Sequence, residues 1–519
     1  MAEPFYVTTA ISYPNGPPHI GHAYEAIATD CIARFNRLRG RDTFFLTGTD
    51  EHGLKMAQAA RGRDIAPLQL ADEMSSLFRQ MADRLHISYD RFIRTTEPAH
   101  HEASQAIWRA MQASGDIYPG RYEGWYSVRD EAFYGEDELL DGEGGARLSP
   151  QGTPVEWTVE ESWFFRLSAY TDRLLAHYEA NPDFIQPEAR RNEVLSFVRG
   201  GLSDLSVSRT SFDWGVPVPD APGHVMYVWV DALTNYLTGI GYPAEGWQKR
   251  WPANLHVIGK DIVRFHAVYW PAFLMSAGLP LPKTVFGHGF LLHRGEKMSK
   301  SLGNVVDPLA LADAFGVDAL RYFLLREVSF GQDGSYSADA IVTRVNAELA
   351  NSFGNLVQRT LAFIAKNLAG RVPAGGGEAA EDAALLAEVR RACADEMPAA
   401  FEALQLSQGI EAWMRGVFAC NAYIDTAAPW ALRKTDPVRM EQVLATLWRA
   451  IVDLAVAIQP VVPASAARIL DMMGVPADER LISNILDDGR HARLVASGFT
   501  LEAPTPVFPR LDLPPEEAS

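Results

Sequence analysis

Two short segments, far apart in the chain, carry residues that could stabilise negative charge. Near the start, Pro18-His19-Ile20-Gly21-His22 places two imidazoles on either side of a glycine. Far downstream, Lys297-Met298-Ser299-Lys300-Ser301 places two lysines in a loop rich in glycine and serine. Attack on the α-phosphate of a nucleoside triphosphate requires positioning, together with cations and hydrogen-bond donors where charge develops. The two segments therefore predict a site that holds a nucleoside triphosphate for such an attack.

Each residue type in these segments has a physical role in that chemistry. His19 and His22 are three positions apart and lie on one side of an expected helix start, whose N–H groups and partial positive charge attract phosphate. Gly21 has no side chain, so a base or ribose can approach the backbone. Lys297 and Lys300 supply mobile charges for the phosphates of a leaving pyrophosphate. Either segment alone could be an ordinary helix cap or a solvated loop, but together they favour nucleotide binding.

The elements around the first segment follow the pattern of a parallel α/β sheet. A strand is expected over 5–10, a helix over 20–37 and a second strand over 41–47, which leads into Gly48-Thr49-Asp50-Glu51-His52-Gly53. Such sheets bind ligands beyond the carboxyl ends of their strands. Both polar turns are expected at that edge.

The rest of the chain changes character twice. An aromatic and turn-rich stretch is expected to be an insertion, strand-like runs resume at 227–231 and 255–259, and helical periodicity dominates from about residue 346. We predict an α/β fold: a Rossmann-like parallel-sheet catalytic domain split by an inserted subdomain and followed by an all-α helical bundle. The expected ranges are 1–115 and 225–290 for the two catalytic halves, 116–224 for the insertion, 291–345 for the lysine loop and its contact region, and 346–519 for the helical domain with its tail.

The bulk composition limits the possible classes of protein. The 519 residues carry a formal net charge of -18, so a surface that is basic throughout is excluded and any nucleic acid must meet a local basic face. Only three cysteines occur, without a C-x-x-C pair, which suits a reducing compartment. Neither a signal peptide nor a membrane-spanning run is recognisable. We expect a cytoplasmic, monomeric protein that does not bind membranes.

The two segments resemble the signature sequences of class I aminoacyl-tRNA synthetases, the second at all five positions. The wider match is to the methionyl-tRNA synthetase family and includes Ala10–Gly16, Gly48–Gly53, Tyr227–Ala232, Ile258–His266 and Phe508–Asp512. This resemblance implies that L-methionine attacks ATP, entering with Mg²⁺, to give methionyl-adenylate and pyrophosphate. It also implies transfer of the methionyl group to the 3′ end of methionine tRNA, including the initiator tRNA.

The resemblance further implies which residues take part. Asp50 would hold the substrate ammonium, and aromatic rings would surround the polarisable thioether, with Tyr13 and His266 supplying polar contacts near the sulfur. His288 fits the ATP group, although it could equally be a structural turn residue. The implied methionine-binding residues are Ile11, Tyr13, Asp50, Trp229, Ala232, Tyr236, Phe265, His266 and Trp270. The implied ATP-binding residues are Gly21, Glu25, Gly259, Asp261, His288 and Lys300, and the implied catalytic residues are His19, His22, Lys297 and Lys300.

An anticodon-reading group is implied in the helical third of the chain. Asn355 and Arg359 are four positions apart and share one helix face, while Trp430 offers a ring on which an unstacked base can lie. Taken alone, Trp430 is as well explained as a buried aromatic at a helix cap.

The insertion departs from the family pattern. Relatives often carry two C-x-x-C pairs there, but the corresponding positions hold residues that cannot form a tetrahedral thiolate site, namely Ser127, Asp130, Leu148 and Gln151. We therefore predict no structural zinc. We expect packing alone to hold the insertion together, around Trp125, Tyr126, Phe133, Tyr134 and Trp157.

Two other functions remain open from the sequence. One is a ligase or nucleotidyltransferase that uses the same phosphate motifs on a small acid without tRNA. The other is a catalytically inactive RNA-binding relative. The helical region with Trp430 argues against the first, and the intact histidines and lysines argue against the second.

Overall fold

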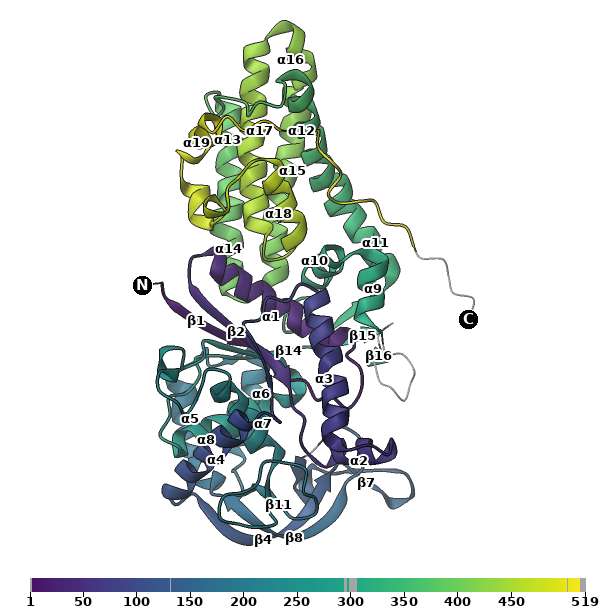
Figure 1. The fold of residues 1–519 in the computed structure, drawn as a ribbon, viewed down its shortest axis with the longest axis vertical. Helices are drawn as coiled ribbons and strands as arrows, with labels where there is room; N and C mark the ends of the chain where they lie inside the picture. Colours follow the sequence, from purple (N-terminus) through teal and green to yellow (C-terminus); the bar gives the residue numbers. More distant parts are fainter. Residues whose placement is uncertain (1, 131, 294–295, 298–305, 502, 514–519) are drawn as a thin grey trace.

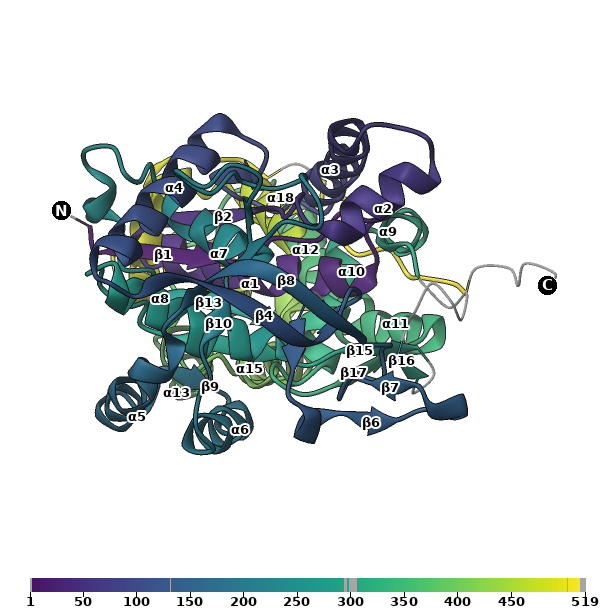
Figure 2. The same ribbon diagram turned by 90° about the horizontal axis from the view of Figure 1, so that it is seen from below.

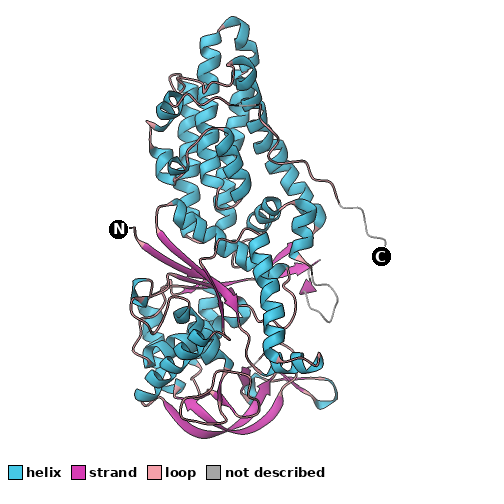
Figure 3. Cartoon of the chain, viewed as in Figure 1, coloured by secondary structure: helices cyan, strands magenta, loops and turns pink. Residues whose placement is uncertain are grey.

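The structure is a computed structural model that describes residues 2–130, 132–293, 296–297, 306–501 and 503–513. An α/β body carries an elongated stack of helices on one side (Figures 1 and 3). Within these described ranges, no helix is long and apolar enough to cross a membrane.

The α/β body is built on one sheet of six parallel strands. Successive residues of each strand face opposite sides, so Val7 and Phe45 pack in one hydrophobic cluster while Tyr6 and Leu46 pack in the other. All five pairings are parallel. The strands, in their order across the sheet, are β3 (Arg91–Arg94), β2 (Asp42–Thr49), β1 (Pro4–Thr8), β13 (Leu255–Gly259), β14 (Val285–His288) and β9 (Ile185–Gln186). This confirms the expected parallel α/β architecture.

Helices cover both faces of this sheet, as parallel strands buried on two sides require. Helix α1 lies on the face that the helical stack also covers, and α4, α7 and α8 lie on the other face. The helices of this body are α1 (Ile20–Leu38), α2 (Leu54–Gly62), α3 (Pro67–Arg84), α4 (Pro98–Ala113), α5 (Thr171–Ala180), α6 (Glu188–Arg199), α7 (Val228–Thr238) and α8 (Trp270–Ser276).

The expected strand over 227–231 is wrong, because this run begins helix α7 instead. A two-residue strand, β12 (Val225–Met226), ends just before it and pairs with β11 (Ser208–Arg209). Nearly every residue of α7 is buried, including polar ones, and its first residues continue the apolar run Tyr227–Val230, which is too short to show a helical period. A short apolar run of this kind cannot be told from a buried strand by periodicity.

The insertion forms an antiparallel sheet of its own. Its two long strands, β4 and β8, run side by side across the underside of the α/β body, which Figure 2 shows from below. One short strand of the range 116–224, β9, instead joins the edge of the parallel sheet beside β14. The antiparallel sheet has the order β10 (Leu205–Ser206), β8 (Glu156–Phe165), β4 (Ile117–Ser127), β5 (Ala132–Tyr134), and a small hairpin pairs β6 (Leu140–Asp141) with β7 (Arg147–Leu148).

Packing alone does not hold the insertion together, because a hydrogen-bonded cluster surrounds Asp130. The Asp130 carboxylate accepts hydrogen bonds from the hydroxyls of Ser149 at 2.7 Å and Tyr134 at 3.1 Å, and another from Thr153. The Asp130 N–H donates to Ser127 Oγ at 3.1 Å. These contacts join the turns at which we predicted no zinc ligands.

The aromatic core expected for the insertion is only partly correct. Tyr126 and Tyr134 are buried, whereas Trp157 is 52% exposed. Trp157 lies edge-on against Trp125, with ring centroids 5.3 Å apart, so the two indoles form a surface pair.

A small sheet and two helices connect the α/β body with the helical region. The lysine segment begins in this sheet, since Lys297 pairs through its backbone with Leu292. The elements are β15 (Leu291–His293), β16 (Glu296–Lys297), β17 (Gly334–Tyr336), α9 (Pro308–Phe315) and α10 (Val317–Glu327).

The described residues from 338 to 501 form the expected stack of helices. Trp413 and Trp448 are fully buried in it, and Trp413 Nε1 donates to the Leu454 carbonyl at 2.9 Å. The helices are α11 (Ala338–Val345), α12 (Asn355–Asn367), α13 (Ala380–Arg390), α14 (Met397–Glu402), α15 (Leu406–Ala427), α16 (Pro429–Thr435), α17 (Pro437–Ile458), α18 (Pro463–Met472) and α19 (Arg490–Ala496).

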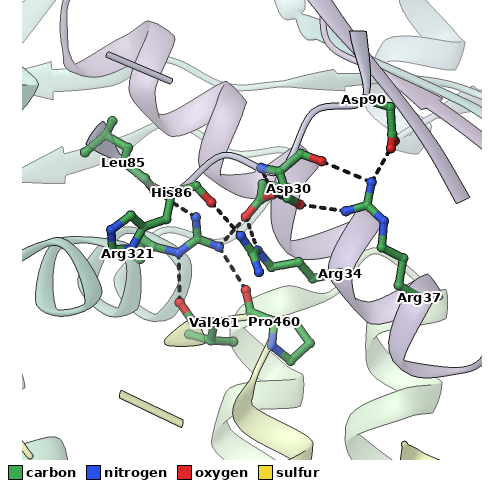
Figure 4. A network of polar contacts seen from close by, with 10 residues as sticks. Asp30, Arg34, Arg37, Leu85, His86, Asp90, Arg321, Pro460 and Val461 are labelled. Carbon is green, nitrogen blue, oxygen red and sulfur yellow. Dashed lines mark hydrogen bonds and ion pairs between the residues drawn. The ribbon is translucent and has the colours of Figure 1, made fainter. Parts of the chain in front are cut away.

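A buried polar contact joins this stack to α1 (Figure 4). Arg321 of α10 is fully buried and donates to Asp30 of α1 at 2.7 Å, as well as to the carbonyls of Pro460 at 3.0 Å and Val461 at 3.1 Å. Nearby, Phe35 of α1 packs edge-on against a ring of α14. One hydrophobic cluster therefore extends from the sheet, around α1, into the helical stack.

Candidate active site

Residues expected to form the site, from four neighbouring strands, gather at the carboxyl edge of the parallel sheet. The turn after β1 leads to His19, Asp50 follows β2, Gly259 ends β13 and His288 ends β14. The chain leaves β1 to form β2 on one side, and β13 occupies the other side, so this edge is a topological switch point. Open α/β sheets bind ligands in the crevice at such a point.

His19 and His22 form a reciprocal cap at the start of α1. Nδ1 of His19 accepts from the Gly21 N–H at 3.0 Å, and Nδ1 of His22 accepts from the His19 N–H at 3.1 Å. The ring centroids lie 3.8 Å apart. Because each Nδ1 is an acceptor, the proton of each neutral imidazole is on Nε2, which is a hydrogen-bond donor.

Gly21 is required by this cap itself. A Cβ atom at Gly21 would lie 2.9 Å from Cε1 of His19, closer than carbon atoms approach without movement. From the sequence, we expected that the absence of a side chain at Gly21 lets a nucleotide approach the backbone. In the structure, its absence also allows His19 to fold back over the first turn.

Glu25 and His288 form a buried pair on the neighbouring side of α1. Nε2 of His288 faces Glu25 Oε2 at 2.8 Å, and Nδ1 faces the Gly289 carbonyl at 2.8 Å, so both ring nitrogens meet acceptors. Burial lowers the pKa of His288, but the hydrogen bond and charge of Glu25 raise it more, and the pKa is raised overall. Burial also raises the pKa of Glu25 despite His288. The pair therefore retains a proton to higher pH than a free histidine does.

Asp261 and Gly259 also belong to the group expected to bind ATP. The Asp261 carboxylate folds back so closely that a Cβ at Gly259 would lie 2.7 Å from Oδ1. The negative charge of Asp261 contributes to the raised pKa of Glu25. A narrow cavity beside α1 is lined by both His22 and Glu25.

A second cavity lies between α7, the turn after β1 and the π-helical turn Phe265–Tyr269. Six of the nine residues expected to bind methionine line it: Ile11, Asp50, Trp229, Ala232, Tyr236 and His266. The sequence did not single out its other lining residues, Ala10, Leu233, Asn235 and Ile262. An apolar wall with a buried carboxylate at one end suits a zwitterion with an apolar side chain.

The hydrogen-bond partners of His266, which lines this cavity, determine which of its ring nitrogens carries the proton. Nδ1 of His266 donates to the Ile262 carbonyl at 3.0 Å, so Nε2 accepts from the Tyr236 hydroxyl at 2.7 Å. Burial lowers the pKa of His266 to about 4. The imidazole is therefore neutral at physiological pH.

The other three residues expected to bind methionine support the cavity from behind or from its side. Phe265 stacks flat on Trp229, with ring centroids 3.8 Å apart. The ring centroids of Trp270 and Tyr236 are 6.1 Å apart. The Tyr13 hydroxyl donates to the His52 carbonyl at 2.9 Å and accepts from an N–H of α2.

A buried carboxylate between two histidines was not found by sequence reasoning. Asp231 of α7 accepts from His52 at 2.6 Å and from His100 of α4 at 2.7 Å. Burial raises the pKa of Asp231, but the two histidines lower it further, so the pKa is well below its usual range. This contact fixes the turn that carries Asp50 against α7, which carries the cavity wall. The one feature of the sequence that could have indicated this contact is His52, which directly follows Asp50-Glu51.

The expected anticodon residues meet on the surface of the helical stack. The guanidinium of Arg359 lies 5.6 Å from the Trp430 ring centroid and pairs with Asp425 at 3.0 Å. Trp430 is 47% exposed, which excludes the alternative of a buried cap aromatic. Asn355 is exposed one turn before Arg359 on α12. An exposed indole beside a guanidinium can stack a single-stranded base.

Part of the lysine segment lies outside the described residues. Lys297 is placed by its backbone alone, and the expectation for Lys300 falls on 298–305, which the structure does not describe. In the part of the chain that is described, no group of three or more histidine, cysteine, aspartate or glutamate side chains is arranged to hold a metal ion.

Comparison with protein families gives two matches that together cover most of the chain. A model described as "tRNA synthetases class I (M)" matches residues 5–361. A model described as "Anticodon binding domain of methionyl tRNA ligase" matches residues 372–514.

Curated relatives and solved structures match over nearly the whole length. Methionine–tRNA ligases of Brucella suis and Rhizobium meliloti are 59% and 58% identical over 518 and 515 residues, covering 98% and 99% of both chains. The Mycobacterium tuberculosis methionyl-tRNA synthetase in complex with methionyl-adenylate superposes with a TM-score of 0.92 at 57% identity, covering 98% of this chain and 100% of that one. The free form of that enzyme gives a TM-score of 0.88 at 54% identity, covering 99% of both chains.

Proposed function

The chain belongs to the methionyl-tRNA synthetase family of class I aminoacyl-tRNA synthetases, and from this premise we propose how its residues carry out the reaction. It is a methionine–tRNA ligase, which activates methionine with ATP and transfers the methionyl group to tRNA. The observation that carries the residue assignment is the meeting of the α7 cavity and the His19–His22 cap at one switch point of the sheet.

The cavity beside α7 takes the methionine side chain. Asp50 at its edge pairs with the substrate ammonium through a charge-assisted hydrogen bond, because the carboxylate lines the cavity. Neutral His266 and the Tyr236 hydroxyl meet the thioether end without placing a charge beside it. Trp229, backed by Phe265, closes the cavity through ring contacts that suit a polarisable sulfur.

ATP, entering with Mg²⁺, lies over the start of α1. Nε2–H groups of His19 and His22 donate to phosphate oxygens, while Gly259 and Asp261 meet the nucleoside beyond β13. The Glu25–His288 pair lies beside them, and its internal hydrogen bond at 2.8 Å fixes both side chains for contact with the bound nucleotide.

The reaction itself needs no nucleophile from the protein. A carboxylate oxygen of methionine attacks the α-phosphorus, the bond to the bridging oxygen breaks, and pyrophosphate leaves with the electron pair. His19, His22, Lys297 and Lys300 stabilise the negative charge that develops on the phosphates. The 3′-terminal ribose of tRNA then accepts the methionyl group and AMP leaves.

The helical region selects the tRNA by its anticodon. Exposed Trp430 and the neighbouring Arg359 provide a stacking surface and a cation, and Asn355 lies on the same helix face as Arg359. We include the initiator tRNA among the substrates. For the catalytic halves, insertion, contact region and helical domain, we propose the ranges expected from the sequence, with β9 of the insertion range as part of the parallel sheet.

We also propose a cytoplasmic monomer without structural zinc. The Asp130 hydrogen-bond cluster supports the absence of zinc, because it joins the turns that a metal would otherwise hold. Elemental analysis of the purified chain tests this assignment. Stoichiometric zinc that survives a chelator wash contradicts it.

Asp50→Asn tests the assignment of the methionine site. Loss of a charge-assisted contact of about 1.5–3 kcal/mol is expected to raise the KM for methionine by about 10- to 100-fold in ATP–pyrophosphate exchange, with the KM for ATP nearly unchanged. Asp42→Asn, at the amino end of the same strand β2, is the matched control and is expected to leave both constants unchanged. An equal rise in both KM values for Asp50→Asn would remove the ammonium role.

A further inference from the structure

The two residues that follow Asp50 are held by buried side-chain contacts. Glu51 is fully buried, and its carboxylate accepts from Arg94 at 2.7 Å and 3.0 Å. His52 is 3% exposed, and its Nδ1 faces the Asp231 carboxylate of α7 at 2.6 Å. Neither of these two side chains lines the methionine cavity, whereas Asp50 does. The backbone that carries the Asp50 carboxylate is therefore fixed by contacts outside the cavity.

Asp231 uses both of its carboxylate oxygens in this contact. Oδ2 faces His52, and Oδ1 faces Nε2 of His100 from α4 at 2.7 Å. The other ring nitrogen of His100 meets the hydroxyl of Thr238, which also lies on α7, at 2.9 Å. Because each oxygen has its own donor, the carboxylate cannot rotate without losing a charge-assisted hydrogen bond. His100 therefore fixes the orientation in which Asp231 meets His52.

The His52–Asp231 contact joins separate parts of the methionine cavity. His52 is two residues after Asp50, and its backbone carbonyl accepts from the Tyr13 hydroxyl at 2.9 Å. Asp231 is two residues after Trp229, which lines the cavity from the first turn of α7. The contact thus sets the position of the Asp50 carboxylate relative to the apolar wall.

The shape of an amino acid makes this relative position important. Its ammonium and its side chain are attached to one carbon atom, so both are bound at once only when the carboxylate and the wall are correctly spaced. A displacement of about 1 Å can cost as much as about 100-fold in a site that depends on positioning. His52, Asp231 and His100 do not line the cavity, so their effect on methionine must act through the residues that do.

We propose that His52, Asp231 and His100 are positioning residues, which set the affinity for methionine by holding Asp50 at a fixed place relative to the α7 wall. This inference rests on the proposed contact between Asp50 and the substrate ammonium. It adds to the site three residues from three elements: the turn after β2, helix α7 and helix α4.

His52→Ala tests the inference in ATP–pyrophosphate exchange. Loss of the donor to Asp231 is expected to raise the KM for methionine at least about fivefold, with kcat and the KM for ATP within about twofold. His52→Asn can place its amide N–H near the position of Nδ1, and its KM for methionine is expected to lie within about twofold of that of the unmodified chain. A role in stability alone would reduce the amount of active enzyme, and hence kcat, without this change in KM.

Two further variants test the other members of the network. Asp231→Asn keeps the shape of the side chain but removes its charge, and His100→Ala removes the donor to Oδ1. Each is expected to raise the KM for methionine at least about threefold. His101→Gln is the matched control, because the His101 ring lies edge-on against His52 with centroids 5.4 Å apart but has no hydrogen bond to Asp231 among the described residues. Its KM is expected to stay within about twofold.

A double-mutant cycle separates this role from that of Asp50 itself. When the ammonium contact is already lost in Asp50→Asn, the addition of His52→Ala is expected to raise the KM for methionine by less than about twofold further. A rise by the same factor as in the unmodified background would show that His52 acts independently of Asp50, and would overturn the inference.

Three other results would also overturn it. They are an unchanged KM for methionine in both His52→Ala and Asp231→Asn, an equal rise in His101→Gln, and a parallel rise in the KM for ATP. Failure of the ammonium contact is seen separately, as an unchanged KM for methionine in Asp50→Asn. Circular dichroism and thermal unfolding verify that each variant is folded, and Asp231→Asn, which preserves the side-chain shape, provides the test if His52→Ala does not fold.

Discussion

His266 shows how a single side chain can define the chemistry of the methionine site. Its neighbours determine which ring nitrogen carries the proton. The Ile262 carbonyl can only accept, so Nδ1 donates to it, and Nε2 then accepts from the Tyr236 hydroxyl. Burial maintains the neutral form. A neutral ring allows an apolar thioether to lie beside it without the cost of burying a charge.

The lowered pKa of His266 predicts how stability depends on pH. Its pKa is about 4 when folded against 6.5 in the unfolded chain, so between these values the unfolded chain binds more protons. Stability is therefore fully present above pH 6.5 and is lost as the pH falls toward 4, by about 2 kcal/mol from this group at pH 5. We expect His266→Gln to have a smaller fall in Tm between pH 7 and pH 5 than the unmodified chain, measured by calorimetry.

His86→Asn is the control for this measurement. His86 is exposed, and its positive φ of 58° is one that asparagine tolerates. Its pH dependence is expected to match that of the unmodified chain. If His266→Gln lost as much Tm as the unmodified chain over this interval, His266 would not be the neutral buried group described above.

At the residue scale, the sequence predicted groups that lie close together in the chain. His19, Gly21 and His22 belong to one turn of one helix, so their spacing alone indicated their joint role. Asp231 could not be predicted in this way, because its partners His52 and His100 come from separate elements. Only the folded chain brings these three groups together.

At the scale of single elements, the insertion depends on the carboxylate of Asp130. Three hydroxyl groups donate to this carboxylate, and its own N–H donates to Ser127. Asp130→Ala is expected to leave these groups without their acceptor, and buried polar groups without partners cost about 1–3 kcal/mol. Hydrogen exchange in β4, β5 and β7 is expected to become faster, as measured by mass spectrometry.

Two further variants make that measurement specific. Asp130→Asn retains one acceptor oxygen and is expected to give a smaller change than Asp130→Ala. Asp137→Ala, at an exposed position of the same insertion, is expected to give none. Unchanged exchange in Asp130→Ala would show that packing alone holds the insertion, as the sequence first suggested.

The elements that the sequence did not predict share a physical cause. Helix α7 is buried almost all round, so its apolar run carries no period that separates a helix from a strand. Strand β9 has only two residues, too few for any pattern, and its place beside β14 is set by tertiary packing. Helices α1 and α17 are also largely buried, but with 19 and 22 residues they are too long for a strand, so their length identified them as helices.

At the scale of the whole molecule, Arg321 connects the helix at the proposed ATP site with the helical stack that carries the proposed anticodon residues. It binds Asp30 of α1, the helix that begins at the His19–His22 cap, and also binds two carbonyls between α17 and α18 (Figure 4). The order of the domains was predictable from the sequence. This contact was not, because it joins residues 30, 321 and 460 through the fold alone.

Arg321→Met is expected to affect tRNA charging more than methionine activation. The variant keeps the volume of the side chain but leaves buried Asp30 with Arg34 as its cationic partner, and the carbonyls of Pro460 and Val461 without their donor. The helical stack is therefore held less firmly against α1. We expect ATP–pyrophosphate exchange to fall less than about threefold and charging to fall about tenfold or more, a difference of roughly 1 kcal/mol. Parallel assays of both reactions give this ratio.

Arg468→Met is the matched control, since Arg468 is on the surface of α18 and contacts Thr505. Neither reaction is expected to change in this control. A proportional loss of exchange and charging in Arg321→Met would show that the contact supports the fold without coupling the two regions.

The most direct test of the account compares activation and charging in Trp430→Ala. The unmodified chain is expected to catalyse ATP–pyrophosphate exchange with methionine and to charge methionine tRNA. Trp430→Ala is expected to retain exchange within about twofold, because Trp430 lies on the helical stack, and to lose charging by about tenfold or more, because stacking on a base contributes about 1–3 kcal/mol. Equal losses in both reactions, or exchange that does not depend on methionine, would contradict the account.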